Sequence, residues 1–142
     1  MIELAHQDIE ALHVFFTKWF RGDIEQPHRA FAAELERRLD PGFTYIPPTG
    51  AWIERETLVA RLHESQNSNP ALEIEISEVR VTEREGQLLA VSYVELQRGS
   101  VNYEATNARR CTVLMRVDES APMGLRWMHL QETAVPLEAI RA

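Results

Sequence analysis

The 142-residue chain has a single cysteine, Cys111, and no apolar run of the roughly 18 residues that a membrane-spanning helix needs. One cysteine excludes an intramolecular disulfide and any metal site built from several cysteines. The first eight residues lack a basic segment followed by an apolar core, so no secretory signal is expected. Together these absences predict a location in the reducing cytoplasm and no membrane partner.

Basic residues are also scarce, with 15 Lys and Arg against 22 Asp and Glu and a formal net charge of -7. Such a surface repels phosphate backbones, so nucleic acid is not an expected partner. The sequence has no phosphate-binding loop, no dinucleotide fingerprint and no Gly-x-Ser-x-Gly nucleophile turn. Its histidines do not follow metal-ligand spacing, so we expect no metal and no cofactor.

What the sequence does contain is enough for one domain, residues 1–142, with 44% hydrophobic residues and a self-sufficient core. The first part is helical in pattern, because apolar residues recur every three or four positions. Gly22-Asp23 and Asp40-Pro41-Gly42 are typical of helix ends. We predict helices over 3–21, 27–39 and 54–64, and a short strand over 43–46.

From residue 72 the apolar period changes to two, which is typical of strands. The alternation changes parity after Ile76, and a β-bulge near Ser77-Glu78 explains that change. Further strands are predicted over 88–97, 102–117 and 125–135. Helices separated along the chain from an antiparallel sheet indicate an α+β fold.

Three segments in this order resemble the nuclear transport factor 2-like superfamily, in particular its SnoaL-like bacterial branch: Phe43 to Gly50, Arg110 to Arg116, and Gly124 to Thr133. The resemblance implies a cone-shaped, cystatin-like fold in which a strongly curved sheet wraps around helices and encloses a pocket. In that family the outer sheet face often packs on a second copy. The family's closing strand often carries two histidines two residues apart, but Gln131 stands at the second position here. Its members include isomerases, cyclases, dehydratases, epoxide hydrolases and noncatalytic modules, so fold alone does not decide function.

Two short connections, a two-residue turn at Gly99-Ser100 and a loop over 119–122, are expected to set which strand residues share a face. One face then mixes aromatic and polar groups, as a ligand pocket does: Leu89, Tyr93, Glu95, Arg110, Thr112, Trp127, His129 and Gln131. The other face is nearly all apolar and predicts a homodimer interface: Val94, Leu96, Cys111, Val113, Met115, Met128 and Leu130.

Ligand contacts are predicted for the polar and aromatic members of the first face together with two earlier aromatic residues: Trp19, Tyr45, Tyr93, Arg110, Thr112, Trp127, His129 and Gln131. Arg110 can hold a carboxylate or phosphate, or form an internal ion pair with a glutamate. His129 can act as an acid or base, or be a buried histidine bonded to a neighbour.

Tyr93 can donate to an oxyanion or be a core aromatic, and Glu95 can be a base or the counter-ion of Arg110. Three functions therefore remain open. The first is a dimeric domain that binds a small organic molecule, anionic or aromatic, and this is our main expectation. The second is a cofactor-free isomerase, cyclase or dehydratase that uses His129 or Glu95. The third is a noncatalytic dimerisation module.

Overall fold

The computed structural model of the protein describes residues 1–140. Its helices are α1 (Ile2–Arg21), α2 (Pro27–Ala30), which continues as a π-helical segment (Phe31–Glu36), α3 (Arg55–Glu64) and a short 3-10 turn (Leu137–Ala139). Its strands are β1 (Leu39–Ile46), β2 (Ile53–Glu54), β3 (Glu73–Glu85), β4 (Leu88–Arg98), β5 (Thr106–Val117) and β6 (Leu125–Val135).

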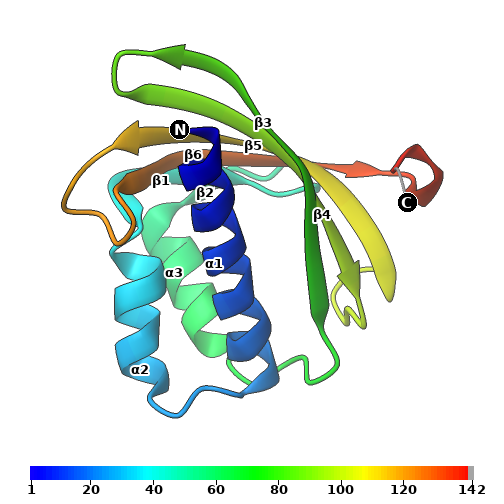
Figure 1. Ribbon diagram of the computed structural model, residues 1–142. Coiled ribbons are helices and arrows are strands. Elements are labelled where there is room, and N and C mark those ends of the chain that lie inside the picture. The colour runs from blue at the N-terminus through cyan, green and yellow to red at the C-terminus, as the bar shows by residue number, and fades with distance from the viewer. Residues whose placement is uncertain (141–142) are drawn as a thin grey trace.

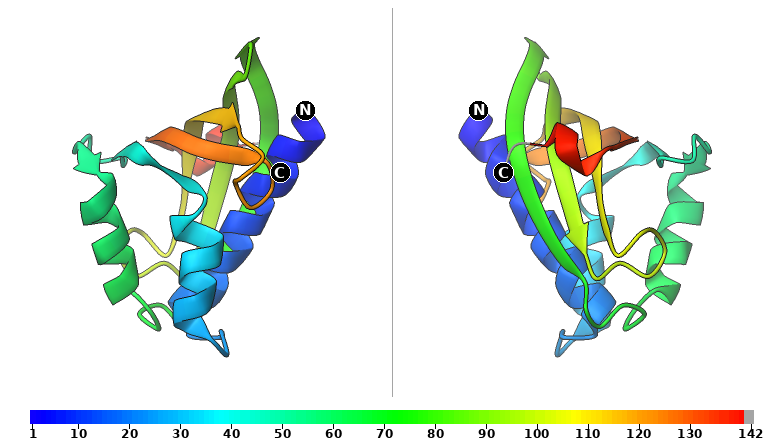
Figure 2. Two further views of the ribbon diagram at one scale, coloured as in Figure 1. Left: turned by 90° about the vertical axis from the view of Figure 1, so that its left-hand side faces the viewer. Right: turned by 90° about the vertical axis from the view of Figure 1, so that its right-hand side faces the viewer.

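The six strands form one sheet in the order β2-β1-β6-β5-β4-β3. Every neighbouring pair is antiparallel except β1 and β6, which are parallel. Helices α1, α2 and α3 all lie on the same side of the curved sheet (Figure 1). The side views show that α3 is separated from α1 on this side (Figure 2). The predicted α+β class, with N-terminal helices packed in a curved sheet, is confirmed.

Helix α1 supplies the apolar stripe that faces the sheet. Ile9, Leu12 and Trp19 are almost completely buried, and their spacing places them on one side of the helix. The helix ends at Gly22, whose φ of 79° is the left-handed conformation that glycine adopts readily. The backbone N–H groups of Gly22 and Asp23 donate to carbonyls of the last turn, so the helix terminus is satisfied.

A bulge in β3 contributes to the bend of the sheet, and it occurs where the sequence predicts it. Ser77 pairs with Val94, but the next paired residue is Arg80, opposite Ser92. Glu78 lies in this irregular stretch and has a φ of 53°. An extra residue on one strand increases local twist, so the bulge helps β3 and β4 curl over α1.

The strand expected over 43–46 begins at Leu39, and β2 is a strand that the sequence did not predict. Two further elements differ from the sequence-based expectation. The second helical segment ends at Glu36 rather than at residue 39, because Leu39 begins β1 and pairs with Trp127 of β6. Strand β5 begins at Thr106 rather than at residue 102. The second difference changes the candidate site.

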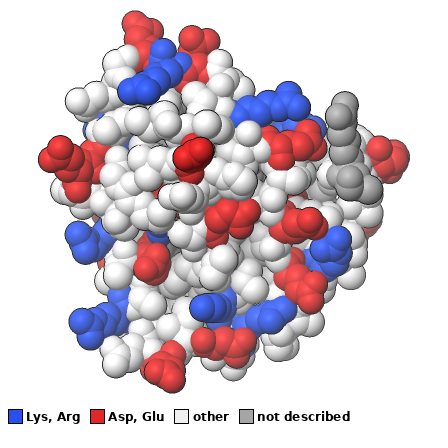
Figure 3. Space-filling view, viewed as in Figure 1, with Lys and Arg blue, Asp and Glu red and all other residues white. Residues whose placement is uncertain are grey.

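Charged side chains of both signs are interspersed on the face shown in Figure 3. The core contains aromatic side chains from α1, the π-helical segment, β1 and β6, and aliphatic side chains from β4 and β5. Within residues 1–140, no helix has the length and apolar character needed to cross a membrane.

Candidate functional site

The connection between β4 and β5 is longer than a two-residue turn, and this overturns the predicted register. Residues 99–105 form the loop, so Tyr93 lies opposite Cys111 and not opposite Thr106. The register differs by five residues, an odd number, which reverses the face that each β5 side chain occupies relative to β4. Consequently Arg109 and Cys111 share a face with Tyr93 and Glu95, and Arg110 does not.

A second irregularity lies in β6. Leu114 pairs with His129, but Met115 pairs with Trp127, so Met128 is an extra residue on β6. The bulge separates side chains that a regular strand would place on one face. Trp127 and Glu132 are therefore buried on the concave side, whereas Gln131 is exposed.

The predicted composition of the dimer face is corrected by the same two features. Cys111, Val113 and Met115 are buried in the core, and Leu130 packs against it. The extra residue of the β6 bulge, Met128, is half-buried. The remaining predicted members, Val94 and Leu96, lie outside the core cluster on the opposite parity of β4.

A cavity of about 190 Å³ lies between α1, α3 and the concave side of the sheet. Much of its wall is apolar, including Leu12, Phe16, Phe20, Leu58, Leu62 and Trp127. Polar groups also reach it, including His13, Tyr45, Glu95, Gln97, Arg109 and Glu132. An apolar pocket with a few convergent polar groups is the usual form of a small-molecule site.

His13 of α1 and Glu95 of β4 form a buried ion pair. The Nε2 atom of His13 lies 3.1 Å from Glu95 Oε1, and Nδ1 lies 2.7 Å from the carbonyl oxygen of Ile9. Both partners are acceptors, so both ring nitrogens donate and the ring is an imidazolium. Burial alone would lower the pKa of His13, but the Glu95 carboxylate outweighs burial and the pKa is raised. Burial opposes ionisation of Glu95 too, yet His13 and other donors hold its pKa at about 2.

Arg109 of β5 and Glu132 of β6 form a second buried pair. Arg109 donates to Glu132 Oε1 at 3.0 Å and to Asn107 Oδ1 at 3.2 Å. The hydroxyl of Tyr45 in β1 donates to the same Glu132 oxygen. Burial and the nearby Glu95 raise the pKa of Glu132, although Arg109 and Tyr45 act in the opposite direction. Glu132 is therefore the cavity carboxyl whose environment most favours taking up a proton.

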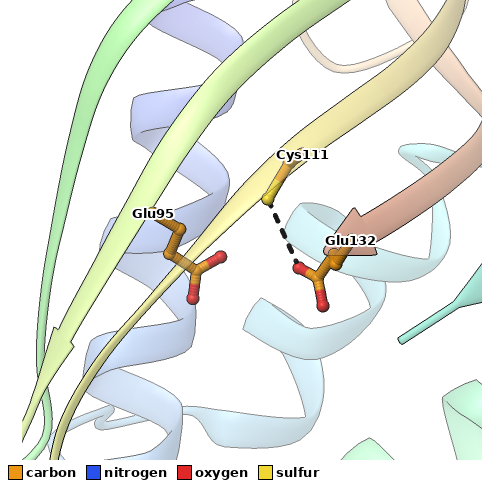
Figure 4. A group of neighbouring side chains, drawn as sticks. All are labelled: Glu95, Cys111 and Glu132. Carbon is orange, nitrogen blue, oxygen red and sulfur yellow. Dashed lines mark hydrogen bonds between the residues drawn. The ribbon is translucent and has the colours of Figure 1, made fainter. Parts of the chain in front are cut away.

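Figure 4 shows Glu95, Cys111 and Glu132 converging from three neighbouring strands. One ligand atom of each lies within 4.8 Å of the others, and the thiol donates to Glu132 Oε2 at 3.7 Å. Burial raises the pKa of the Cys111 thiol, so the thiolate that would bind a metal is disfavoured. His13 and Arg109 already balance both carboxylates. The cluster is better suited to hydrogen bonding than to holding a cation.

Arg109 also meets the loop that closes this end of the cavity. Its guanidinium carbon lies 4.5 Å from the centre of the Tyr103 ring, a cation–π distance. The Nε–H of Arg109 is buried and has no hydrogen-bond partner among residues 1–140.

The structure places three of the predicted site residues at the cavity: Tyr45, Glu95 and Trp127. Tyr93 is fully buried beside His13, with ring centres 5.6 Å apart, and does not contribute to the cavity wall that the structure describes. Trp19 is a core residue whose indole N–H donates to the carbonyl of Leu62 at 2.7 Å.

The other predicted ligand contacts are on the outer side of the sheet. Arg110 lies 3.8 Å from Glu78 of β3, so its ion pair within residues 1–140 is not the one with Glu95 that the sequence suggested. His129 shares a 2.7 Å hydrogen bond with Thr44 and lies beside the exposed Trp52 ring. The exposed residues Thr112 and Gln131 pair with each other across β5 and β6. These residues do not converge on the cavity.

Sequence reasoning missed His13, Arg109 and Glu132. One signal was available: residues 104–107 are Glu-Ala-Thr-Asn, which show no apolar alternation, so a later start of β5 could have been inferred. No comparable signal marks the bulge at Met128, because Trp127 and Met128 are both apolar.

Comparison with solved structures identifies this arrangement of elements. An NTF2-like protein of unknown function from Pseudomonas aeruginosa superposes with a TM-score of 0.82 at 24% identity, covering 94% of this chain and 99% of that one. The chain has the nuclear transport factor 2-like (NTF2-like) fold. A second NTF2-like protein, from Cytophaga hutchinsonii, has a TM-score of 0.71 at 15% identity and covers 94% of this chain and 97% of its own.

The NTF2-like fold is shared by proteins described in different functional terms. A ketosteroid isomerase-like protein from Erwinia carotovora matches 95% of this chain and 96% of its own, with a TM-score of 0.60 at 12% identity. No protein-family model and no curated protein matches the sequence. The function must therefore be argued from the site.

Proposed function

We propose that this chain binds a small organic molecule in the cavity, with an apolar body against α1 and α3 and an anionic or hydrogen-bonding end at Arg109 and Glu132. The observation that carries the proposal is a polar cluster of four ionisable side chains in the wall of an otherwise apolar cavity. Buried charges are costly, and each of these has a partner. Arg109, Tyr45 and Glu132 all lie in the cavity wall, where the polar end of a ligand can meet them.

The size of the cavity limits the ligand. Its volume of about 190 Å³ lies below the roughly 300–1,000 Å³ of sites for drug-sized molecules. A single ring or short branched chain with one polar group is the expected size. Anionic ligands are favoured over cationic ones, because the raised pKa of Glu132 lets this carboxyl take up a proton and leaves the Arg109 charge for the ligand.

A ligand panel tests this proposal: monocyclic carboxylates such as benzoate and phenylacetate, and the matching neutral amides. We expect saturable binding by calorimetry at one site per chain, tighter for the carboxylates. Leu58→Trp fills the cavity from α3 and should abolish binding. Val14→Trp, on the half-exposed outer side of α1, should not. Equal binding to both variants would place the ligand outside the cavity.

A second candidate function is cofactor-free proton transfer, and the environment of Glu132 favours it. A buried carboxyl with a raised pKa is a stronger base than an exposed one once it is ionised. Glu132 would remove a proton next to a ligand carbonyl, and Arg109 would stabilise the enolate oxygen. Glu95 is less suited, because a pKa of about 2 makes it a weak base. His129 lies on the outer face and is not a candidate for this reaction.

Deuterium incorporation tests the second candidate without knowledge of the product. Small cyclic ketones are incubated with the protein in D2O and followed by NMR. Wild type should accelerate exchange of the hydrogens next to the carbonyl, and Glu132→Gln should lose the acceleration. Glu73→Gln, on the exposed edge of β3, is the control. Exchange no faster than in buffer would leave ligand binding as the function.

We further propose that a second copy of the chain covers the outer sheet face. Leu114 and Trp52 expose apolar surface there, since the two residues are 37% and 62% exposed. No helix of residues 1–140 lies over this face (Figures 1 and 2). The SnoaL-like assignment and the cytoplasmic location stay predictions from the sequence.

A further inference from the structure

His28 and His63 lie 35 residues apart in the sequence but meet in the fold. His28 is the second residue of α2, and His63 is near the end of α3. The Nε2 atom of His63 lies 3.3 Å from Nδ1 of His28, and the two ring planes are inclined by 19°. Both side chains are exposed, so solvent and ions reach the pair.

The separation of the two nitrogens matches a shared metal ion. Two imidazole nitrogens bonded to one ion at roughly 2.0–2.1 Å stand about 3.3 Å apart on a tetrahedron and about 2.9 Å apart on neighbouring corners of a square. The observed separation of 3.3 Å equals the tetrahedral value, so the two nitrogens already lie at the distance that a shared ion requires.

One of the two rings is held in place by the core. The His63 ring is edge-on to Phe31, with ring centres 5.1 Å apart, and 6.0 Å from Trp19. Both aromatic residues are buried. A ligand that is already ordered loses less entropy on binding. Arg29, which follows His28 in the chain, carries a positive charge, and its side chain donates to Gln26 at 3.5 Å.

We propose that His28 and His63 form a binding site for a late first-row divalent metal ion, namely Cu²⁺, Ni²⁺ or Zn²⁺, with water as the remaining ligands. Imidazole suits these ions, whereas Mg²⁺ and Ca²⁺ require oxygen ligands. The net charge of -7 favours a cation in general. The bound ion connects α2 to α3, and α3 supplies Leu58 and Leu62 to the cavity wall.

Unlike the Glu95, Cys111 and Glu132 cluster, the pair of His28 and His63 has ligand atoms that are not already paired with buried protein cations. In the cluster, buried His13 and Arg109 already neutralise the carboxylates. Between His28 and His63, only a 3.3 Å contact between two imidazoles has to be replaced. The inference is independent of the proposed ligand in the cavity.

The test uses the full chain without a histidine tag, titrated with CuCl2, NiCl2 and ZnCl2 by calorimetry. We expect one ion per chain, tightest for Cu²⁺. The electron paramagnetic resonance spectrum of the Cu²⁺ form should show coupling to two imidazole nitrogens. His28→Asn and His63→Asn should each weaken binding by about tenfold or more. His6→Asn, on the exposed side of α1, should leave it unchanged.

Three results would overturn the proposal. The first is no saturable binding at micromolar metal concentrations. The second is binding that persists unchanged in both His28→Asn and His63→Asn, with circular dichroism showing that they are folded. The third is loss of binding in Cys111→Ser with no loss in the histidine variants, which would locate the ion in the interior cluster instead. A thermal unfolding midpoint that rises with metal in wild type only would support it.

Discussion

Two glutamates in the cavity wall have pKa values moved in opposite directions. Glu95 faces an imidazolium and a carboxamide, and its pKa falls to about 2. Glu132 shares its surroundings with Glu95, and burial together with this second carboxylate raises its pKa. The same residue type thus serves as a permanent counter-ion in one position and as a titratable group in the other.

Glu95 should stabilise the fold in a defined pH range. Its pKa is about 2 in the folded protein against 4.5 ordinarily, so its stabilisation is complete above pH 4.5 and is lost as the pH falls toward 2. Glu95→Gln should therefore lower the free energy of unfolding by on the order of 3 kcal/mol at pH 7. Urea unfolding at pH 7, 4 and 3 should show the difference shrinking. A difference that does not change with pH would contradict this account.

Glu132→Gln provides the contrast. The folded protein binds the Glu132 proton more tightly than the unfolded chain, so the stability of wild type falls as the pH rises above 4.5 through the raised pKa. Glu132→Gln removes that decline. The difference between wild type and variant should therefore change in the opposite direction from that of Glu95→Gln.

At the scale of secondary-structure elements, α1 is fastened to the sheet by Asp8. Asp8 is fully buried, accepts from Arg38 at 2.9 Å, and accepts from the indole N–H of Trp127 at 2.7 Å. Arg38 in turn accepts the backbone N–H of Trp127 through its carbonyl at 2.8 Å. One carboxylate therefore joins α1 to the segment before β1 and to β6.

Asp8→Ala should destabilise the protein by about 3 kcal/mol, because it leaves the buried Arg38 charge with only the half-exposed Glu34 carboxylate, 3.4 Å away. Glu75→Ala removes an exposed ion pair with Arg98 and should cost about 0–1 kcal/mol. Both values can be measured by chemical unfolding at pH 7. Equal effects would mean that the buried pair contributes no more than a surface one.

The loop that sets the register of β5 depends on Gly99. Its φ is 70°, and a Cβ atom there would lie 2.2 Å from the carbonyl oxygen of Ala71. At Gly86, φ is 59° and an added Cβ would meet nothing within 4 Å in residues 1–140. Gly86→Ala should cost roughly 1–2 kcal/mol for the left-handed backbone alone. Gly99→Ala should cost distinctly more in thermal unfolding, and a similar cost would contradict the clash.

The sequence predicts the helices and strands better than it predicts which strand residues pair with each other. Helix α1 follows from its apolar period, and the bulge at Glu78 follows from a change of parity that one strand carries by itself. The side-chain faces of β5 depend on the length of a connection whose residues contact other parts of the chain. His13, Arg109 and Glu132 come from three separate elements, so only the assembled fold shows that they meet.

For the whole molecule, the outer face provides the test of self-association. A homodimer of 16.3 kDa chains should give about twice that mass by light scattering. Leu114→Glu places a charge on the outer side of β5 and should give the monomer mass. Val14 is also an exposed apolar residue, but it lies on α1, so Val14→Glu should remain dimeric. Wild type that stays monomeric at 100 µM would rule out this interface.

The positions of the three tryptophans allow intrinsic fluorescence to report on both sides of the sheet. Trp19 and Trp127 are completely shielded from solvent, whereas Trp52 is 62% exposed on the outer face. Acrylamide should therefore quench one emitting population and spare the other. A molecule entering the cavity alters the shielded emission through Trp127, and a partner on the outer face protects the quenchable emission of Trp52. One quenching experiment can thus distinguish ligand binding in the cavity from association at the outer face.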